Sequence, residues 1–205
     1  MEANTLNPNF CENELKKIKA NLRKIFKAVG LENISPGKLL RPRLGLLVAQ
    51  KLKLVDDITN ELTAVELIHN ASLFHDDVID EATVRRNSPS LNFLKGSKFS
   101  ILYGDLLILN ATRLILDSKN REIFELYVKT VENMIMGELI EISNTNNLKL
   151  DFQQYMDIIR KKVEVFLDFR RQYLPLFVRK ITNFSTISVL KLVLNIKKWM
   201  ICSIL

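Results

Sequence analysis

The stretch from His75 to Glu81 reads His-Asp-Asp-Val-Ile-Asp-Glu, and an arginine pair, Arg85 and Arg86, follows it. On a helix, Asp76 and Asp80 would share one face, where like charges four residues apart repel each other. Mg²⁺ would relieve that repulsion, because it binds oxygen ligands from one or two carboxylates together with substrate phosphates. The forked donors of arginine suit phosphate oxygens. The segment therefore predicts a metal-diphosphate site. The alternative is a helix end capped by acids and followed by a solvated basic turn.

The composition sets limits on the class of protein. A chain of 205 residues with 47% apolar residues is sufficient for one packed domain or for part of a larger one. Cys11 and Cys202 lie near opposite ends without metal-ligand or redox spacing, which favours a reducing compartment. The first residues lack a signal-peptide pattern, and we expect no apolar stretch to reach the ~20 residues that cross a bilayer. These features predict a cytoplasmic protein without a transmembrane segment.

The net charge of +7 is concentrated near the end of the chain. Residues 163–205 hold seven Lys/Arg against two Asp/Glu, a net of +5, and residues 1–162 hold 23 against 21, a net of +2. The near-neutral part has no basic stripe interleaved with aromatic side chains, the pattern that favours nucleic-acid binding. The charge therefore does not predict a nucleic-acid partner.

Apolar residues recur at helical spacing through most of the chain. Gly30 closes the first predicted helix, and Thr59 or Asn60 can cap the third. No alternating strand pattern, hairpin signal or internal repeat is present, so we predict an all-α fold of long, largely buried helices. His69 precedes Asp76 by two turns, about 10 Å along the same helix face. The predicted helices cover about residues 15–29, 43–52, 59–76, 99–116 and 123–142, with another beginning at Asp151.

Three motifs, in this order and spacing, resemble the trans-isoprenyl diphosphate synthases, also called the polyprenyl synthetase family. They are Gly37-Lys38-x-x-Arg41-Pro42, Glu66-Leu67-Ile68-His69, and Asp76-Asp77-x-x-Asp80 followed by Arg85, Arg86 and Pro89. Supporting matches are Tyr103-Gly104-Asp105-Leu106-Leu107, Gly137-Glu138 and the segment from Tyr155 to Lys162. The resemblance covers about residues 15–162. It implies that residues 1–162 are the N-terminal part of an isoprenoid-synthase-type bundle of long helices around a central cavity, incomplete at its C-terminus.

The resemblance also implies a reaction, the Mg²⁺-dependent head-to-tail condensation of isopentenyl diphosphate onto an allylic diphosphate. The allylic substrate loses its diphosphate, the double bond of isopentenyl diphosphate attacks the allylic carbocation, and a proton is removed. Metal ions and cationic side chains stabilise the negative charge that develops on the leaving group. Position by position, the resemblance gives catalytic roles to Asp76, Asp77, Asp80, Arg85 and Lys162, with Asp76 and Asp80 as the metal ligands. It assigns the allylic diphosphate to Arg85 and Lys162, and isopentenyl diphosphate to Lys38, Arg41, His69 and Arg86.

Several positions depart from the family pattern or bear on the product. Pro36 and Leu39 replace a glycine and an arginine, and neither change removes a diphosphate-binding group assigned above. Asn87 replaces a glycine after the arginine pair, and asparagine tolerates the left-handed backbone that such a turn requires. Ala71 and Ser72 stand where bulky side chains stop chain elongation in the family. Their small size predicts a medium- or long-chain polyprenyl product.

The second Asp-Asp-x-x-Asp motif of the family, which carries the remaining metal ligands, is absent from this chain. Tryptophan and methionine each have one codon, and isoleucine codons begin with AT. Read from the last base of the Trp199 codon, Trp199-Met200-Ile201 therefore gives GAT-GAT, which encodes Asp-Asp. Helical phasing is also lost after Lys162. We predict a frameshift near Lys162, with residues 163–205 as an out-of-frame, non-homologous tail and with impaired activity.

Two other classes of protein stay open at this point. A non-catalytic subunit of a heteromeric prenyl synthase would also lack aspartates, although such subunits commonly lose the first motif as well. A helical interaction protein would have no enzymatic role, with Lys38 and Arg41 as exposed turn residues and His69 as a structural helix residue. The family resemblance favours two diphosphate substrates and a homodimer for the intact protein.

Overall fold

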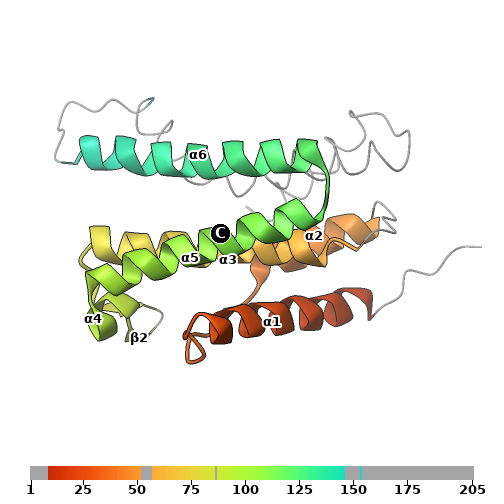
Figure 1. Cartoon of the computed structure of the whole chain (residues 1–205), viewed down its shortest axis with the longest axis horizontal. Helices are drawn as coiled ribbons and strands as arrows, with labels where there is room; N and C mark the ends of the chain where they lie inside the picture. Colours follow the sequence, from red (N-terminus) through yellow and green to blue (C-terminus); the bar gives the residue numbers. More distant parts are fainter. Residues whose placement is uncertain (1–8, 52–56, 86, 146–152, 154–205) are drawn as a thin grey trace, which may run out of the picture. The chain divides into compact units, whose positions relative to one another are not determined.

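The computed structural model describes residues 9–51, 57–85, 87–145 and 153, and most of them are helical (Figure 1). The described part contains α1 (Phe10–Ala28), α2 (Leu40–Lys51), α3 (Thr59–Ile79), α4 (Leu91–Lys95), α5 (Ser97–Asp117) and α6 (Arg121–Ser143). Between α3 and α4, β1 (Val84–Arg85) pairs with β2 (Ser88–Pro89) in an antiparallel ladder, with Val84 opposite Pro89. The all-α prediction is confirmed. The short α4 and the strand pair were not predicted.

The chain divides into two compact units. The first comprises residues 1–47 and 56–119, and the second comprises residues 48–55 and 120–205. The first unit holds α1, α3, α4, α5, the strand pair and most of α2. Every predicted site residue that the structure describes lies in this unit. In the second unit, the Asn120 side chain accepts hydrogen bonds from the backbone N–H groups of Glu122 and Ile123 and caps the start of α6.

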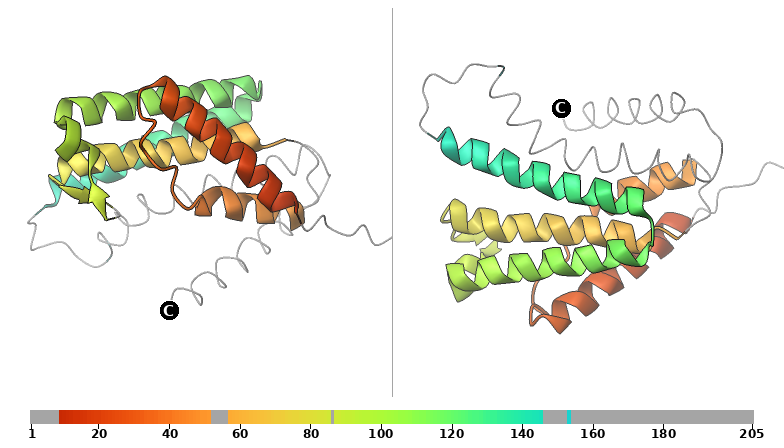
Figure 2. Two further views of the ribbon diagram at one scale, coloured as in Figure 1. Left: turned by 90° about the horizontal axis from the view of Figure 1, so that it is seen from below. Right: turned by 45° about the horizontal axis from the view of Figure 1, so that its top comes forward.

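Helices α3 and α5 form the centre of the first unit, where they run side by side (Figures 1 and 2). Their fully buried residues include Ala64, Leu67 and Ala71 of α3 and Leu107, Ala111 and Ile115 of α5. Alanine and leucine at three- to four-residue spacing form the ridges and grooves by which helices pack closely. Helix α1 lies against α3 and buries Ile18, Leu22 and Phe26. This packing covers one side of α3 and leaves another face more open.

The start of α3 differs from the prediction in how it is capped. The helix begins at Thr59 as expected, after Ile58, which offers no capping side chain. The Asp57 carboxylate accepts a hydrogen bond from the Thr59 N–H at 2.9 Å, and the Thr59 hydroxyl donates to Glu14 of α1 at 3.0 Å. The prediction that Thr59 or Asn60 caps the helix is therefore wrong, because a tertiary contact with α1 uses the threonine hydroxyl.

Helix α5 is long and apolar enough to cross a bilayer, by its length and composition alone. The expectation that no apolar stretch reaches that length is therefore wrong for this helix. A helix in the core of a soluble protein passes the same test, and α5 buries Ser100, Gly104, Leu107, Ala111 and Ile115 along one face. These residues recur every three or four positions, as they do on a helix that packs against a neighbour.

Candidate active site

One face of α3 carries the predicted metal ligands. Because α3 is continuous from Thr59 to Ile79, His69 and Asp76 lie two turns apart on the same face, and Asp80 follows at the C-cap. His69 and Asp76 are half-buried and Asp80 is exposed, whereas Leu67 and Phe74 on the opposite side are buried. The structure therefore places His69, Asp76 and Asp80 together on the side of α3 that is not used for the core.

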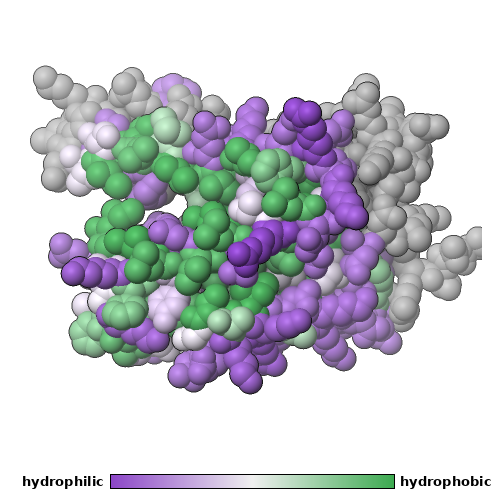
Figure 3. All heavy atoms as spheres, in the orientation of Figure 1, coloured by the Kyte–Doolittle hydropathy of each residue, from purple (hydrophilic) through white to green (hydrophobic). Residues whose placement is uncertain are grey.

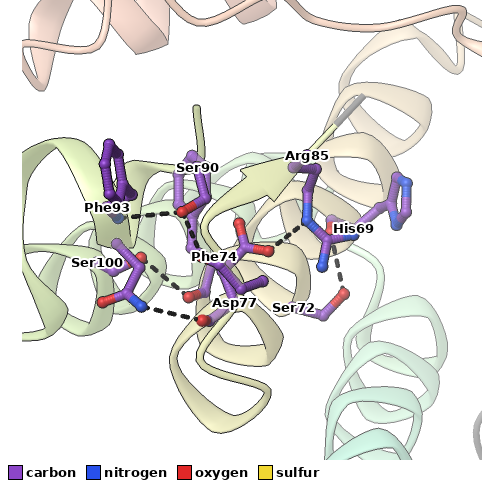
Figure 4. Close-up of polar contacts among 10 residues, drawn as sticks. His69, Ser72, Phe74, Asp77, Arg85, Ser90, Phe93 and Ser100 are labelled. Atoms are coloured by element: carbon purple, nitrogen blue, oxygen red, sulfur yellow. Dashed lines mark hydrogen bonds and ion pairs between the residues drawn. The ribbon is translucent and has the colours of Figure 1, made fainter. Parts of the chain in front are cut away.

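The second aspartate of the motif points elsewhere. Asp77 is 1% exposed, and its Oδ1 accepts a hydrogen bond from Nε of Arg85 at 2.5 Å (Figure 4). The Asp77 backbone carbonyl accepts further hydrogen bonds from the Asn92 side chain at 3.1 Å and from the Ala82 N–H at 2.9 Å. A buried carboxylate needs a cationic partner. Arg85 is that partner for Asp77, and the pair holds Arg85 next to the end of α3. The structure thus brings Asp77 and Arg85 into direct contact.

The turn between the acids and the arginines depends on left-handed backbone geometry. Glu81 has φ 51° and Asn87 has φ 62°. The expectation for Asn87 is therefore confirmed. Ser90 holds this turn against α4, since its hydroxyl donates to the Ala82 carbonyl at 2.6 Å and accepts from the Phe93 N–H at 3.0 Å (Figure 4). These bonds keep Arg85 close to the carboxyl end of α3.

The Gly37-to-Pro42 motif leads into α2. Gly37 and Leu39 both have left-handed backbone, with φ 79° and φ 52°. Lys38 is exposed and Arg41 is half-buried in the first turn of α2. Leu39, which replaces the family's arginine, is buried and contributes to the core. The assignment of isopentenyl diphosphate to Lys38 and Arg41 stays a prediction.

The two residues predicted to set the chain length lie one turn before Asp76. Ala71 is fully buried, while Ser72 is half-buried and its hydroxyl donates to the His69 carbonyl at 2.9 Å (Figure 4). Arg86, Lys162, the helix predicted at Asp151 and the tail of residues 163–205 lie outside the described residues. Their roles also stay predictions.

The acids of α3 fit a divalent metal ion that takes part of its ligands from water and substrate. Within the described ranges, no group of three or more His, Cys, Asp and Glu side chains is arranged to hold a metal ion. Asp76 and Asp80 offer two carboxylates, and Asp77 is bound to Arg85. Two carboxylates suit Mg²⁺, because it keeps several waters and takes phosphate oxygens from its substrate.

A contact beside these acids has no signal in the sequence. His75 Nε2 lies 3.3 Å from the Asp105 carboxylate, which connects α3 to α5. In the sequence, Gly104 and Asp105 belong to one of the supporting family matches. A sequence pattern does not show which residue of a distant helix Gly104 and Asp105 will contact.

Comparison with known proteins identifies the family. The profile described as Polyprenyl synthetase matches residues 23–169. The chain belongs to the polyprenyl synthetase family. It is 35% identical over 138 residues to solanesyl diphosphate synthase 3 of Arabidopsis thaliana, covering 58% of this chain and 33% of that protein. It is 29% identical over 127 residues to octaprenyl diphosphate synthase of Escherichia coli, covering 62% and 39%. The chain therefore spans about a third of the length of the curated relatives it matches.

Solved structures confirm the predicted isoprenoid-synthase fold of the chain. Octaprenyl pyrophosphate synthase of Helicobacter pylori has a TM-score of 0.73 at 27% identity, covering 90% of this chain and 62% of that one. Polyprenyl synthase of Caulobacter crescentus has a TM-score of 0.72 at 25% identity, covering 78% and 52%. The latter was solved in complex with calcium and isoprenyl diphosphate.

Proposed function

We propose that this chain is a polyprenyl diphosphate synthase, which condenses isopentenyl diphosphate head to tail onto an allylic diphosphate. The observation that carries the proposal is the open face of α3, where half-buried Asp76 and exposed Asp80 lie beside the Asp77–Arg85 pair. Family membership supports the same reaction, since relatives are named as long-chain prenyl diphosphate synthases.

In this proposal Asp76 and Asp80 hold Mg²⁺ through their carboxylates. When bound, the metal supplies Lewis-acid stabilisation of the diphosphate leaving group. Arg85 complements it with fixed positive charge. Its bond to Asp77 uses Nε, so the terminal amino groups of the guanidinium can serve as donors to the allylic diphosphate. Asp77 then acts by orienting Arg85.

The remaining assignments follow the motifs. Lys162 joins Arg85 on the allylic diphosphate, and Lys38, Arg41, His69 and Arg86 hold isopentenyl diphosphate. His69 supports this arrangement because it shares the open face of α3 with Asp76. Cations around both diphosphates offset the repulsion between two substrates that carry negative charge.

We also propose a medium- or long-chain product. Ala71 and Ser72 are small and lie one turn before Asp76, so they leave room where bulky side chains would stop elongation. The names of relatives such as solanesyl and octaprenyl diphosphate synthase agree with a long product. Product analysis of an active form by mass spectrometry tests this assignment. A product no longer than C15 would refute it.

A homodimer is part of the proposal, and α5 offers a surface for it. Leu102, Leu106, Leu109 and Leu116 are each more than 40% exposed, and Figure 3 shows apolar side chains gathered over α5. Asp105 and Arg113 are both exposed and lie four residues on either side of Leu109. An antiparallel second copy of α5 centred on Leu109 would bring Asp105 opposite Arg113, as a twofold interface requires. We further propose a cytoplasmic location, although some relatives are named as mitochondrial or chloroplastic.

A binding experiment tests the function directly. The full chain should bind inorganic diphosphate in a Mg²⁺-dependent manner, as measured by isothermal titration calorimetry. Asp76→Asn and Asp80→Asn should abolish that dependence, because each removes a carboxylate ligand. Asp117→Asn changes an exposed aspartate at the end of α5 and serves as the control. If Asp76→Asn binds as the unchanged protein does, a helical interaction protein becomes the better description.

A further inference from the structure

The residue immediately before the metal-binding acids connects α3 to α5. His75 Nε2 lies 3.2 Å from the backbone carbonyl oxygen of Ile101 and 3.3 Å from Oδ1 of Asp105. Both neighbours are hydrogen-bond acceptors, so Nε2 carries the proton and donates. The imidazole therefore reaches the backbone of α5 itself as well as a side chain on it.

This close approach requires a glycine in α5. A Cβ added at Gly104 would lie 2.2 Å from Nε2 and 2.6 Å from Cδ2 of His75. Glycine in the middle of a helix is less favourable than alanine, and Gly104 has ordinary helical backbone. Glycine at position 104 offsets this cost by leaving space for the imidazole ring of His75.

Two other bonds show where this contact lies along α3. One residue before His75, the Phe74 carbonyl accepts a hydrogen bond from the buried Ser100 hydroxyl at 2.9 Å (Figure 4). Two residues after it, the Asp77 carbonyl accepts one from Asn92 at 3.1 Å. His75 thus lies in the last turns of α3, where helix ends fray and where Asp76 and Asp80 repel each other.

We propose that His75 is a positioning residue for the metal-binding acids. Its imidazole fits over Gly104, bonds to the Ile101 carbonyl, lies 3.3 Å from the Asp105 carboxylate, and holds the end of α3 against α5. Asp76 and Asp80 thereby keep their spacing when no metal is bound. This inference rests on the proposed function of Asp76 and Asp80 as metal ligands.

The test compares Mn²⁺ affinity among variants of the full chain in the presence of inorganic diphosphate, using electron paramagnetic resonance. His75→Ala should weaken Mn²⁺ binding about tenfold, the size of effect typical when support for a metal ligand is lost. Gly104→Ala should do the same, because its Cβ displaces the imidazole. His75→Gln should retain most of the affinity, since its amide N–H can replace the Nε2 donor.

Ser100→Ala is the matched control, because it removes a neighbouring α3–α5 hydrogen bond and leaves His75 in place. It should lower thermal stability without changing Mn²⁺ affinity. Equal weakening in Ser100→Ala and His75→Ala would overturn the proposal, because general loosening of the helix pair would then explain both. The double variant of His75→Ala and Gly104→Ala should be no weaker than either single change.

A second measurement does not depend on metal. Nitrogen-15 NMR of the two histidines should show the Nε2–H form at His75, identified by the signal that is lost in His75→Gln, and Gly104→Ala should mix the two tautomers. Asp76→Asn separates the two proposals. If it abolishes Mn²⁺ binding while His75→Ala binds normally, the positioning role is wrong and the metal site stands. If Asp76→Asn has no effect, both proposals fail.

Discussion

The aspartates of the motif have different roles because successive residues of α3 point about 100° apart. Asp76 and Asp80 fall on the open face, whereas Asp77 turns into the protein and pairs with Arg85. Three acids in the sequence thus become two metal-ligand candidates and one anchor for a cation. The sequence predicts an assisting catalytic role for Asp77. Its contact with Arg85 suits such a role, because it orients the guanidinium.

Arg85 should be needed for stability as well as for substrate binding. Arg85→Ala leaves the buried Asp77 carboxylate without its cation and should lower the free energy of unfolding by about 3 kcal/mol. Adding Asp77→Asn to that variant should recover part of the loss, because the uncompensated charge disappears. Urea denaturation of the single and double variants measures both effects. A double variant no more stable than Arg85→Ala would contradict the pairing.

At the scale of the element, α3 shows how a helix start depends on its neighbours. Hydrogen bonding to Thr59 lowers the pKa of Asp57 below its ordinary value of 3.8. A carboxyl with a lowered folded-state pKa stabilises the protein above its unfolded-state pKa, and this contribution is lost as the pH falls through the folded-state pKa. Asp57 therefore stabilises α3 at neutral pH and loses that effect in acid below about pH 4.

Substitution of Asp57 should show this pH dependence. Asp57→Ala should cost about 1 kcal/mol of stability at pH 7, the usual value of one hydrogen bond. The difference from the unchanged protein should shrink as the pH falls below about 4. Urea denaturation at pH 7 and in acid provides the measurement. Asp57→Asn keeps an acceptor oxygen without a charge, so it should lose less stability at pH 7. Its difference from the unchanged protein should also shrink in acid, because the titrating carboxyl belongs to the unchanged protein. A constant difference for Asp57→Ala at every pH would argue against the assignment.

For the whole molecule, the exposed stripe on α5, made of Leu102, Leu106, Leu109 and Leu116, predicts a homodimer. Leu109→Glu should convert a dimer to monomers, because two charges would meet at the centre of the proposed interface without partners. Leu94→Glu places the same charge on α4, also at an exposed leucine, and should leave the dimer intact. Size-exclusion chromatography with light scattering distinguishes the two states. Dimers that persist in Leu109→Glu would exclude the stripe as the interface.

The nucleotide sequence tests the predicted tail. If a frameshift occurs near Lys162, the shifted frame around Trp199 should encode an aromatic-Gln-x-x-Asp-Asp segment, of which only Asp-Asp is already required by the code. Joining that frame to residues 1–162 should raise prenyltransferase activity well above that of the present chain, because it restores the missing metal ligands. Sequencing across codons 155 to 205 and a product assay of the rejoined chain provide the check. A shifted frame without the acidic motif would refute the frameshift.

Much of the fold followed from local patterns. Apolar spacing predicted helices close to α1, α3, α5 and α6, because a helix must bury one stripe of side chains. The left-handed backbone of Asn87 was also predicted, since few residues tolerate it. By contrast, the short α4 and the strand pair gave no signal of their own. They depend on contacts such as those of Ser90 with the turn before them.

The family, the all-α class and the placement of His69, Asp76 and Asp80 on one helix face could be predicted without the structure, because helical periodicity and motif spacing are local properties. Three contacts became visible with the packing of the helices. Asp77 is buried against Arg85, Thr59 bonds to Glu14 instead of capping α3, and His75 contacts α5 at Gly104. These contacts join residues up to 45 positions apart. The partner of a polar side chain across such distances depends on how the helices pack, and no local pattern in the chain specifies it.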